Sequence, residues 1–497
     1  MIDLFAGPGG LGEGFASFTD THKDYPFDIR LSAEKDPVAQ QTLELRTFLR
    51  AFRGEPVFPR EYAEFLRGKI SREQLLSHYP NQASRARDHA QLFELGESNR
   101  KALEARLDAL ALDRDRTVVI GGPPCQAYSL AGRSRNGAKG DWSLETDHRS
   151  HLYREYLHVL AHVQPVAFVM ENVKGLLSAR LNGESLFNRI LEDLGDPVRA
   201  VGKRGARRRY RIVPIVKPLD NPTPSLFSGR GNLSPSSFIV RAEQHGVPQA
   251  RHRVILLGIC ESTPERSELR LKIGKTRKVW DAIGSLPALR SGVSGIEDSW
   301  DGWYNTLRDT KKAAWWGEIE KEVATRICEA LDRTRESVLY REAHVVRMGK
   351  RLHAVVNHQT RGHMPKDLHR YLFAAAWADL YGESPTLRDY PPSLLPDHAN
   401  VKQALTRGHF GDRFRVQVWN SPSSTVVSHI SKDGHYYIHP DPAQCRSLTV
   451  REAARLQTFP DDYWFCGPRT MQYHQVGNAV PVQLARQIAA LVHAHVA

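Results

Sequence analysis

Short apolar runs alternate with stretches of helical period over the first half of the chain. Six runs have the composition of buried strands: residues 2–5, 29–34, 117–122, 165–171, 211–216 and 253–259. Between them lie amphipathic patterns such as HLYREYLHVLAHV at 151–163, where apolar positions recur every three or four residues. Continuous apolar strands that alternate with helices are typical of a mainly parallel, doubly wound sheet. We therefore predict an α/β domain over residues 1–258, with ligands at the carboxyl ends of its strands.

Three further stretches depart from this alternation. Residues 45–112 are charged and helical in spacing, which predicts a helical insertion in the first domain. From 259 to 445, tryptophans and proline-rich turns favour a second, mixed domain, in which residues 413–427 are expected to form paired strands. Over 446–497 helical signals return: Thr449 and Glu452 have the spacing of a capping box. The last helix, at about 481–496, is expected to pack back on the first domain's sheet.

Composition narrows the class of partner. The chain has 497 residues, with 69 Lys and Arg against 56 Asp and Glu, which gives a net charge of +13. Such a charge favours a polyanion, most simply nucleic acid, although a merely basic enzyme fits it equally well. Five cysteines without a CxxC pair indicate a reduced, intracellular protein without a disulfide framework. We expect a cytoplasmic location, and a nucleoid-associated one if the partner is DNA. We find no signal peptide and no apolar run long enough for a membrane span.

A glycine-rich loop follows the first predicted strand. Residues 7–12, GPGGLG, fit the pattern GxGxxG, in which glycines let the backbone pass close to a ligand. Glu34 closes the second strand, where its carboxylate is suitably placed for ribose hydroxyls. Dehydrogenases that use nicotinamide cofactors share this signal, and a plain tight turn is the simpler interpretation. Pro8 and Gly10 make the loop less like a pyrophosphate cradle, and Asp3 and Phe5 inside the strand suggest a nucleoside held against an aromatic face.

Three further motifs carry reactive side chains. Cys125 follows two prolines at the end of a predicted strand, on a turn that presents side chains rather than burying them. Glu171 ends the strand that a parallel sheet can place next to it. Arg251 and Arg253 alternate along GVPQARHR, so both can face one pocket. Each motif taken alone has a simpler interpretation. Cys125 could be a buried, inert cysteine, and Glu171 could be a carboxylate at the start of a helix. The two arginines could belong to an ordinary basic strand edge.

A thiolate, a carboxyl group and a guanidinium group around a planar heterocycle suggest nucleophilic activation of a pyrimidine ring. Carbon 5 of cytosine is a poor nucleophile, and addition of a thiolate at carbon 6 activates it. Glu171 at ring nitrogen 3 and an arginine at the carbonyl oxygen would stabilise the developing charge. Carbon 5 can then accept a methyl group from S-adenosylmethionine, after which proton loss and elimination free Cys125. The base must leave the duplex to enter such a pocket.

The motifs DLFAGPGG, GGPPCQAYS, ENVKGLL, GVPQARHR, LTVREAARLQTFPDD and QVGNAVP occur in this order along almost the whole chain. Together they resemble the DNA (cytosine-5) methyltransferase family of bacterial restriction–modification or defence systems. The resemblance implies an α/β fold: a Rossmann-like, S-adenosylmethionine-dependent methyltransferase domain with an inserted, mixed target-recognition domain. The final segment, 446–497, would then return to the catalytic domain.

The resemblance also implies roles for individual residues. Cys125 would be the nucleophile, Glu171 would hold the ring nitrogen, and Arg253 and secondarily Arg251 would contact the cytosine and its loop. The implied S-adenosylmethionine site comprises Phe5, Gly7, Gly9, Glu34, Pro124 and Asn478, with Glu97 as the adenine contact. The implied DNA contacts are Gln126, Ser129 and Arg133 in a mobile catalytic loop of residues 126–152, together with Gln249 and Thr425. No metal is needed, although His429, His435, His439 and Cys445 have a spacing that zinc could use.

The resemblance implies double-stranded DNA as the partner of a monomeric enzyme that marks host DNA, alongside other proteins of a restriction or phage-defence system. Three alternatives stay open at this point. An RNA cytosine-5 methyltransferase would have a similar fold. A nicotinamide-dependent dehydrogenase would leave PPCQ, ENV and GNAVP unexplained, and a nonenzymatic DNA-binding relic would not need the intact catalytic residue types. The first strand begins at residue 2, which suggests an N-terminally trimmed chain.

Overall fold

A central mixed sheet organises the first half of the chain. The computed structural model describes residues 1–53, 59–124, 152–181, 184–217, 234–266, 269–348, 352–397, 401 and 413–497. The sheet has eight strands in the order β3-β2-β1-β4-β5-β10-β8, with β9 paired to β10. Their bounds are β1 Ile2–Leu4, β2 Leu31–Glu34, β3 Ala90–Leu92, β4 Val118–Gly121, β5 Ala167–Val173, β8 Tyr210–Val213, β9 Ile239–Arg241 and β10 His252–Cys260. The six strands predicted from apolar runs are therefore confirmed, within one or two residues at most ends.

The register of the parallel strands aligns their carboxyl ends along one edge. Leu4 pairs with Ala33 on β2 and with Gly121 on β4, and Gly121 pairs with Met170 on β5. The glycine loop and the Pro-Pro turn follow β1 and β4. Glu34 is the last residue of β2, and Glu171 lies near the end of β5. The sheet thus brings motifs that are far apart in sequence to the same edge. The strands β10 and β8 are antiparallel, so the sheet is mainly but not wholly parallel.

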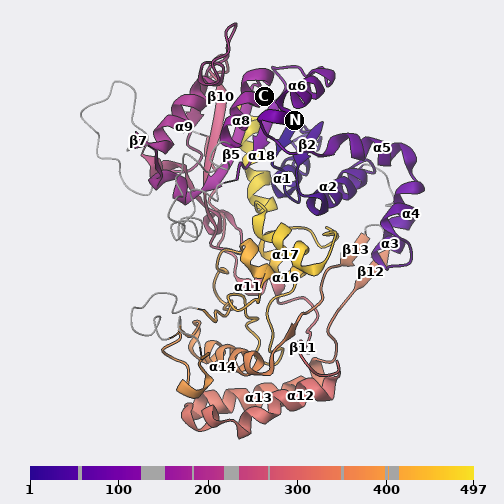
Figure 1. Cartoon of the computed structure of the whole chain (residues 1–497), viewed down its shortest axis with the longest axis vertical. Helices are drawn as coiled ribbons and strands as arrows, with labels where there is room; N and C mark the ends of the chain where they lie inside the picture. Colours follow the sequence, from indigo (N-terminus) through magenta and orange to yellow (C-terminus); the bar gives the residue numbers. More distant parts are fainter. Residues whose placement is uncertain are drawn as a thin grey trace.

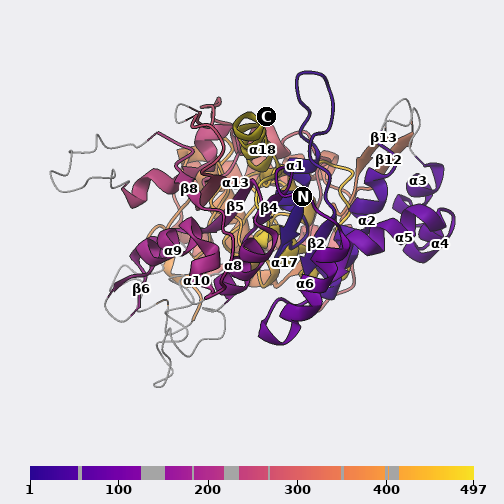
Figure 2. The same ribbon diagram turned by 90° about the horizontal axis from the view of Figure 1, so that it is seen from above.

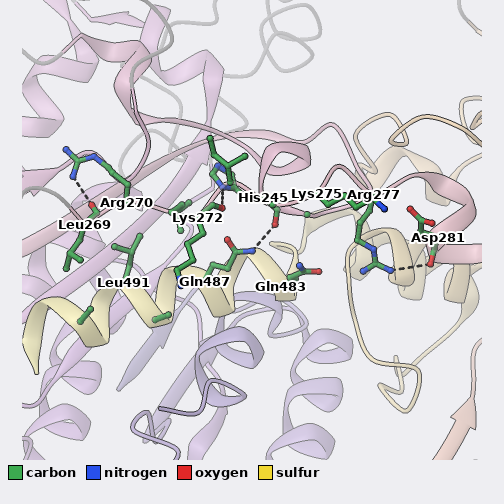
Figure 3. Close-up of a pocket in the computed structure, with 16 residues that line it drawn as sticks. His245, Leu269, Arg270, Lys272, Lys275, Arg277, Asp281, Gln483, Gln487 and Leu491 are labelled. Carbon is green, nitrogen blue, oxygen red and sulfur yellow. Dashed lines mark hydrogen bonds between the residues drawn. The ribbon is translucent and has the colours of Figure 1, made fainter. Parts of the chain in front are cut away.

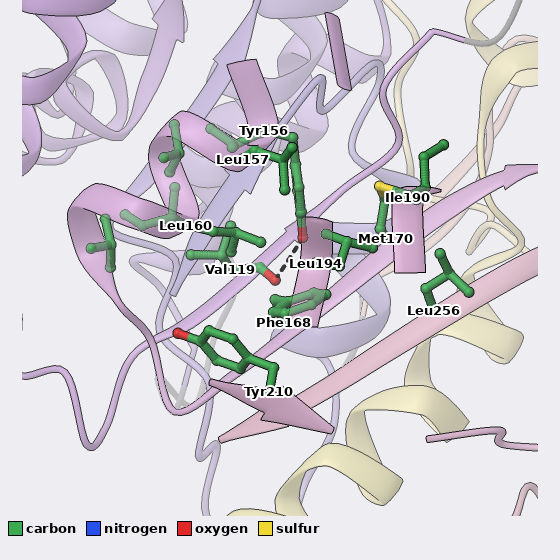
Figure 4. Packing of buried hydrophobic residues seen from close by; sticks show 14 of the residues in the cluster. Val119, Tyr156, Leu157, Leu160, Phe168, Met170, Ile190, Leu194, Tyr210 and Leu256 are labelled. Carbon is green, nitrogen blue, oxygen red and sulfur yellow. Dashed lines mark hydrogen bonds between the residues drawn. The ribbon is translucent and has the colours of Figure 1, made fainter. Parts of the chain in front are cut away.

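Helices cover both faces of the sheet (Figures 1 and 2). On one face pack α6 Arg100–Ala109, α8 Leu152–Val163 and α9 Leu186–Gly195, and on the other α1 Gly10–Ala16 and α18 Val482–Val496. Figure 4 shows the α8 side, where the Tyr156 hydroxyl donates to the carbonyls of Val119 and Val169 at 3.3 and 3.0 Å. Strands buried on both faces explain the continuous apolar runs in the sequence.

The last helix, α18, packs on the first domain's sheet, as predicted, and also directly on α1. A Cβ atom added at Gly14 of α1 would lie 2.3 Å from the Cβ of Ala485 on α18. One added at Gly10 would lie 2.3 Å from the carbonyl oxygen of Val480. Only glycine permits such close approach of the two backbones. The C-terminal segment therefore completes the layer that covers the glycine loop.

The predicted helical insertion is helical, but part of it belongs to the sheet. Its helices are α2 Pro37–Arg50, α3 Arg60–Leu66, α4 Arg72–Ser77, α5 Pro80–His89 and α6. Within the predicted 45–112 range, β3 pairs in parallel with β2, and α6 packs against α8. The part that lies outside the sheet layers is α3 to α5, residues 60–89, which we call the helical insertion. A three-residue strand is too short to produce a periodic signal.

The second half of the chain forms a core of its own around α12 Trp300–Arg308, α13 Lys321–Ser337 and α14 Pro365–Tyr381. Trp303 and Trp315 are buried in it. A hairpin of β12 Val345–Met348 and β13 Leu352–Val355 extends from this half toward α3 (Figure 1). The remaining shorter elements are α10 Pro197–Ala200, α11 Val279–Ile283, α16 Val450–Leu456, α17 Arg469–Asn478 and the two-residue strands β6 Arg180–Leu181, β7 Glu184–Ser185, β11 Gly292–Val293 and β14 Gly362–His363.

The paired strands predicted for residues 413–427 are wrong. This segment contains only isolated bridges, which join Val416 to Ile438 and Ser423 to Gln249. Side chains take the backbone bonds that a ladder would need: the Ser384 hydroxyl accepts from the Val416 N–H, and Gln417 Oε1 accepts from the Ser424 N–H. The capping box of α16 is confirmed, since the side chains of Thr449 and Glu452 bond each other's backbone N–H groups.

Candidate active site

Glu171 and Arg253 meet at the carboxyl edge of the sheet. Arg253 Nε lies 2.9 Å from Glu171 Oε1, and both side chains are largely buried. A Cβ atom at Gly122 would lie 3.3 Å from Glu171 Oε2, so the turn after β4 passes directly beside this carboxyl group. The predicted nucleophile follows three residues later. Cys125 lies outside the described residues, as do the predicted DNA contacts Gln126, Ser129 and Arg133.

Arg251 does not share the pocket of Arg253. Its side chain is 3% exposed, and its Nη1 donates to the carbonyl oxygen of Val426 at 2.7 Å. The prediction that both arginines face one pocket is therefore wrong. Strand alternation would place them together, but β10 begins only at His252, and Arg251 precedes it in a turn whose backbone N–H bonds the Gln249 carbonyl.

Gln249 is fully buried and links three segments. Its Nε2 donates to the Leu456 carbonyl and to Gln457 Oε1, both at 3.1 Å, and its Oε1 accepts from the Val426 N–H at 2.9 Å. Its predicted contact with DNA is therefore wrong, because its polar atoms bond groups inside the protein. Thr425 is half-buried and its hydroxyl donates to the Ala250 carbonyl at 2.6 Å. Its contact with DNA stays a prediction.

The glycine loop and Glu34 form a second group at the same edge. The Gly7 N–H donates to Glu34 Oε2 at 2.7 Å, and the Asp36 N–H donates to Oε1 at 2.8 Å. Burial raises the pKa of Glu34, and these backbone bonds only partly offset that effect. Gly7 has a φ of +56°, and a Cβ atom there would meet nothing within 4 Å. The loop therefore leaves open space above Gly7, next to a carboxylate.

The C-terminal segment closes the other side of this loop. The Tyr463 hydroxyl donates to the Pro8 carbonyl, and a Cβ atom at Gly9 would lie 3.1 Å from the Tyr463 oxygen. Asn478 ends α17, two residues before Val480, and its exposed side chain lies 3.3 Å from His474 Nδ1.

The other predicted cofactor residues take different positions. Phe5, directly after β1, is half-buried with a φ of +54°. Pro124 is half-buried at the end of the turn after β4. Glu97 is exposed in a short 3-10 helix, Glu97–Asn99, that follows β3, and its adenine contact stays a prediction.

The comparison with protein families decides the class. The profile of the C-5 cytosine-specific DNA methylase family matches residues 98–197 and 233–493. The chain belongs to this family. The predicted enzyme class, a DNA (cytosine-5-)-methyltransferase on a methyltransferase-type α/β fold, is thereby confirmed. The dehydrogenase and the nonenzymatic relic are no longer needed as explanations.

Curated relatives of this methylase are bacterial and archaeal enzymes. Type II methyltransferase M.Bpa9945I from Bacillus paralicheniformis is 31% identical, over 99% of this chain and 98% of its own length. Type II methyltransferase M.AgeI from Thalassovita gelatinovora is 28% identical, over 75% of this chain and 81% of its own. DNA (cytosine-5-)-methyltransferase M.ApeKI from Aeropyrum pernix is 27% identical, over 78% and 83% respectively.

Asp3 of the methylase was predicted to lie near a bound nucleoside, but it was not counted among the cofactor-binding residues. Asp3, on β1 beneath the glycine loop, is 1% exposed, and neither carboxylate oxygen has a hydrogen-bond partner among the described residues. Burial raises the pKa of Asp3 to about 7. A Cβ atom at Gly12 would lie 2.5 Å from Asp3 Oδ2, so α1 crosses directly over this carboxyl. The only sequence signal was an acidic residue inside an apolar strand.

A buried ion cluster supports the loop from α2. Glu13 accepts from Arg46 Nη2 at 2.6 Å and from Arg50 Nη2 at 2.9 Å, and Arg46 Nη1 also lies 3.0 Å from Asp462 Oδ2. Burial alone would raise the pKa of Glu13, but the two guanidinium groups outweigh it and hold the value at about 2. The cluster joins α1, α2 and the segment around residue 462.

The histidines and cysteine with zinc-like spacing bond elsewhere. His435 Nδ1 pairs with the Tyr371 hydroxyl, His439 lies beside Glu452, and the Cys445 thiol donates to the Leu368 carbonyl. In the part of the methylase that the structure describes, no group of three His, Cys, Asp or Glu side chains is placed to hold a metal ion. None of the described helices combines the length and apolar character needed to cross a bilayer.

One large cavity lies away from these residues. It measures about 1000 Å³ and opens between α18 and residues 269–277 (Figure 3). Its lining includes Leu271, Lys272, Gln487 and Leu491 and shares no residue with the predicted site. The chemistry is therefore expected at the strand edge, where Glu171 lies, and not in this cavity.

Proposed function

We propose that this methylase transfers a methyl group from S-adenosylmethionine to carbon 5 of a cytosine that is flipped out of duplex DNA, through a covalent adduct with Cys125. The observation that carries the proposal is the pair of Glu171 and Arg253 beside Gly122, at the sheet edge that also holds the glycine loop. The substrate base and the methyl donor would thus occupy neighbouring strand ends. The names of the type II relatives support a role in restriction–modification.

The glycine loop suits a nucleoside-bearing methyl donor. When bound, S-adenosylmethionine supplies the methyl group. The open space above Gly7 leaves room for a ligand against the backbone. The Glu34 carboxylate ends β2 with its oxygens already oriented by the N–H groups of Gly7 and Asp36, so it is held ready to accept from hydroxyl groups.

The second group of residues suits the cytosine. The Cys125 thiolate would add to carbon 6, which forms a C–S bond and places negative charge on the ring. Glu171 would share a hydrogen bond with ring nitrogen 3, and Arg253 would fix the orientation of Glu171 through the 2.9 Å contact. After carbon 5 has gained the methyl group, loss of its proton and cleavage of the C–S bond release Cys125.

The proposal is tested by trapping the adduct. First, bisulfite sequencing of DNA from cells that make the protein should show one methylated sequence context. A duplex with 5-fluorocytosine at that position, which cannot lose a proton from carbon 5, should then form a stable protein–DNA complex in the presence of S-adenosylmethionine. The Cys125→Ser variant should form none. Methylated DNA without a trapped complex would overturn the covalent mechanism, and unmethylated DNA would overturn the proposed activity.

A further inference from the structure

The helical insertion shares one hydrophobic core with a hairpin from the second half of the chain. Phe65 and Leu66 on α3 pack in the same cluster as Ala354 on β13 and the adjacent Val356. All four side chains are buried. Both views show β12 and β13 beside α3, far from the rest of the second domain's helices (Figures 1 and 2). The insertion is therefore not a free appendage of the catalytic domain.

Further contacts stabilise the packing between α3 and the β12–β13 hairpin. Arg67 Nη2 donates to the Val346 carbonyl on β12 at 3.1 Å. The Phe65 ring meets the edge of Trp464 at a centroid distance of 5.2 Å, and the Tyr62 hydroxyl donates to the Asp462 carbonyl at 2.8 Å. The insertion thus contacts both the hairpin and the C-terminal segment that closes the glycine loop.

The insertion itself is held firmly on the catalytic domain. Glu44 on α2, almost fully buried, pairs with Arg72 of α4 and with Arg87 of α5, the latter at 3.4 Å. Phe48 on the same helix packs against Phe52 and Tyr79 at 5.2 and 5.9 Å between ring centroids. The helical insertion is thus attached to α2, which packs beside β2 and β3 of the sheet. A segment that packs on α3 is therefore held in place relative to the sheet.

The second domain has another, separate attachment to the catalytic domain. Ser423 bridges to Gln249, and the Arg251 and Gln249 side chains bond the backbone of Val426. Domain interfaces in a single chain ordinarily permit relative motion. Further bonds join this domain to the C-terminal segment, such as the one from Arg451 Nε to the Val356 carbonyl at 2.7 Å. Attachments at different places remove rotations that a single one would allow, which favours one orientation of the surface that meets DNA.

We propose that the helical insertion is the second anchor of the target-recognition domain, and that it sets how strictly the enzyme discriminates its target sequence. The inference rests on the proposed methyl transfer to duplex DNA. Reading a base pair depends on hydrogen bonds whose donors are placed within a fraction of an ångström. Phe65 and Leu66 of α3, which are buried within the protein, are therefore positioning residues for recognition.

The first test needs neither DNA nor cofactor. Hydrogen exchange is measured on the whole chain for Phe65→Ala, the conservative Phe65→Leu and the exposed control Lys69→Ala. Phe65→Ala should speed exchange of the β12–β13 amides, whereas Phe65→Leu and Lys69→Ala should leave it at the wild-type rate. Unchanged exchange in Phe65→Ala would overturn the anchor, whatever the enzyme's activity.

The second test measures discrimination. Once the methylated sequence is known, initial rates are compared on that duplex and on duplexes with one substituted base pair. Phe65→Ala and Arg67→Ala should lower the preference for the correct duplex about tenfold, through a higher KM for it at nearly unchanged kcat. Phe65→Leu should restore the preference. A lowered melting temperature with wild-type discrimination would overturn the proposal, while a wild-type enzyme that methylates no duplex would instead refute the proposed function.

Discussion

Arg253 and Glu171 form a diagonal pair across two antiparallel strands. In the register of β10 and β5, Arg253 lies opposite Val173 and Ile255 opposite Glu171, so the side chains of Arg253 and Glu171 point to the same face. Their contact at 2.9 Å is made from rigid sheet positions rather than from loops. Such placement favours preorganised chemistry, because little movement is needed when a substrate arrives.

Replacing Arg253 tests this pair. We expect Arg253→Ala to lower kcat by about 100-fold or more, since loss of one preorganised donor typically has that effect. Arg253→Lys keeps the charge but not the planar guanidinium, so its kcat should lie between the values of the wild type and of Arg253→Ala. Methyl transfer is measured with radiolabelled donor, and unfolding is followed to show that the variants fold. Wild-type kcat in Arg253→Ala would contradict the assigned role.

The Cys125→Ser variant separates chemistry from cofactor binding. Because a hydroxyl is far less nucleophilic than a thiolate near neutral pH, methyl transfer should fall below detection. The affinity for S-adenosylmethionine, measured by calorimetry, should stay within about twofold because the glycine loop is untouched. A fully active serine variant would refute nucleophilic addition by this residue.

A pair of glycine substitutions tests the contact between the two ends of the chain. A Cβ atom at Gly10 would lie 2.3 Å from the Val480 carbonyl, so Gly10→Ala forces α1 and α18 apart. We expect it to lower the free energy of unfolding by about 2 kcal/mol or more, as overpacking does. At Gly96 a Cβ atom meets nothing within 4 Å, so Gly96→Ala is the matched control and should be nearly neutral. Equal stabilities in urea unfolding would contradict the contact.

Asp3 predicts a specific pH dependence. Burial raises its pKa from 3.8 to about 7, so the folded state holds the proton more tightly than the unfolded state does. The contribution of this group to stability is then largest at low pH, declines as the pH rises from about 3.8 to about 7, and stays constant above. A pKa difference of three between the folded and unfolded states changes the free energy of unfolding by about 4 kcal/mol.

The Asp3→Asn variant should lack this decline, because its amide does not titrate. Its free energy of unfolding, relative to wild type, should therefore increase between pH 4 and pH 7 and level off at alkaline pH. Urea titrations of both proteins at several pH values measure the difference, in which contributions from other groups largely cancel. A constant difference across this range would show that Asp3 is ionised in the folded enzyme.

The sequence predicted what short-range patterns determine. The apolar runs at residues 117–122 and 165–171 became β4 and β5 because strands buried on both faces need no alternation. The capping box at Thr449 was readable because its partners lie three residues apart. Glu171 was placed correctly beside the Pro-Pro turn, since parallel strands align their carboxyl ends, but β5 continues beyond it to Val173.

Other features depended on partners that are distant in sequence. Gln249 and Arg251 look like ligands of a polyanion, yet their side chains bond the Leu456 and Val426 carbonyls, which no local pattern reveals. The role of α3 depends on Val346 and Trp464, some 280 and 400 positions further along the chain. Residues 413–427 have strand-like composition, but side chains satisfy their backbone groups before a ladder can form.

The contact of Gly10 with Val480, and of Gly14 with Ala485, has a consequence for biosynthesis. A ribosome makes the first strand and α1 long before it makes the helix that covers them. During translation the apolar face of α1 must remain uncovered or be shielded by other means until α18 has been synthesised. A product terminated upstream of Val480 would therefore lack the helix that covers α1, and its apolar face would stay exposed to solvent.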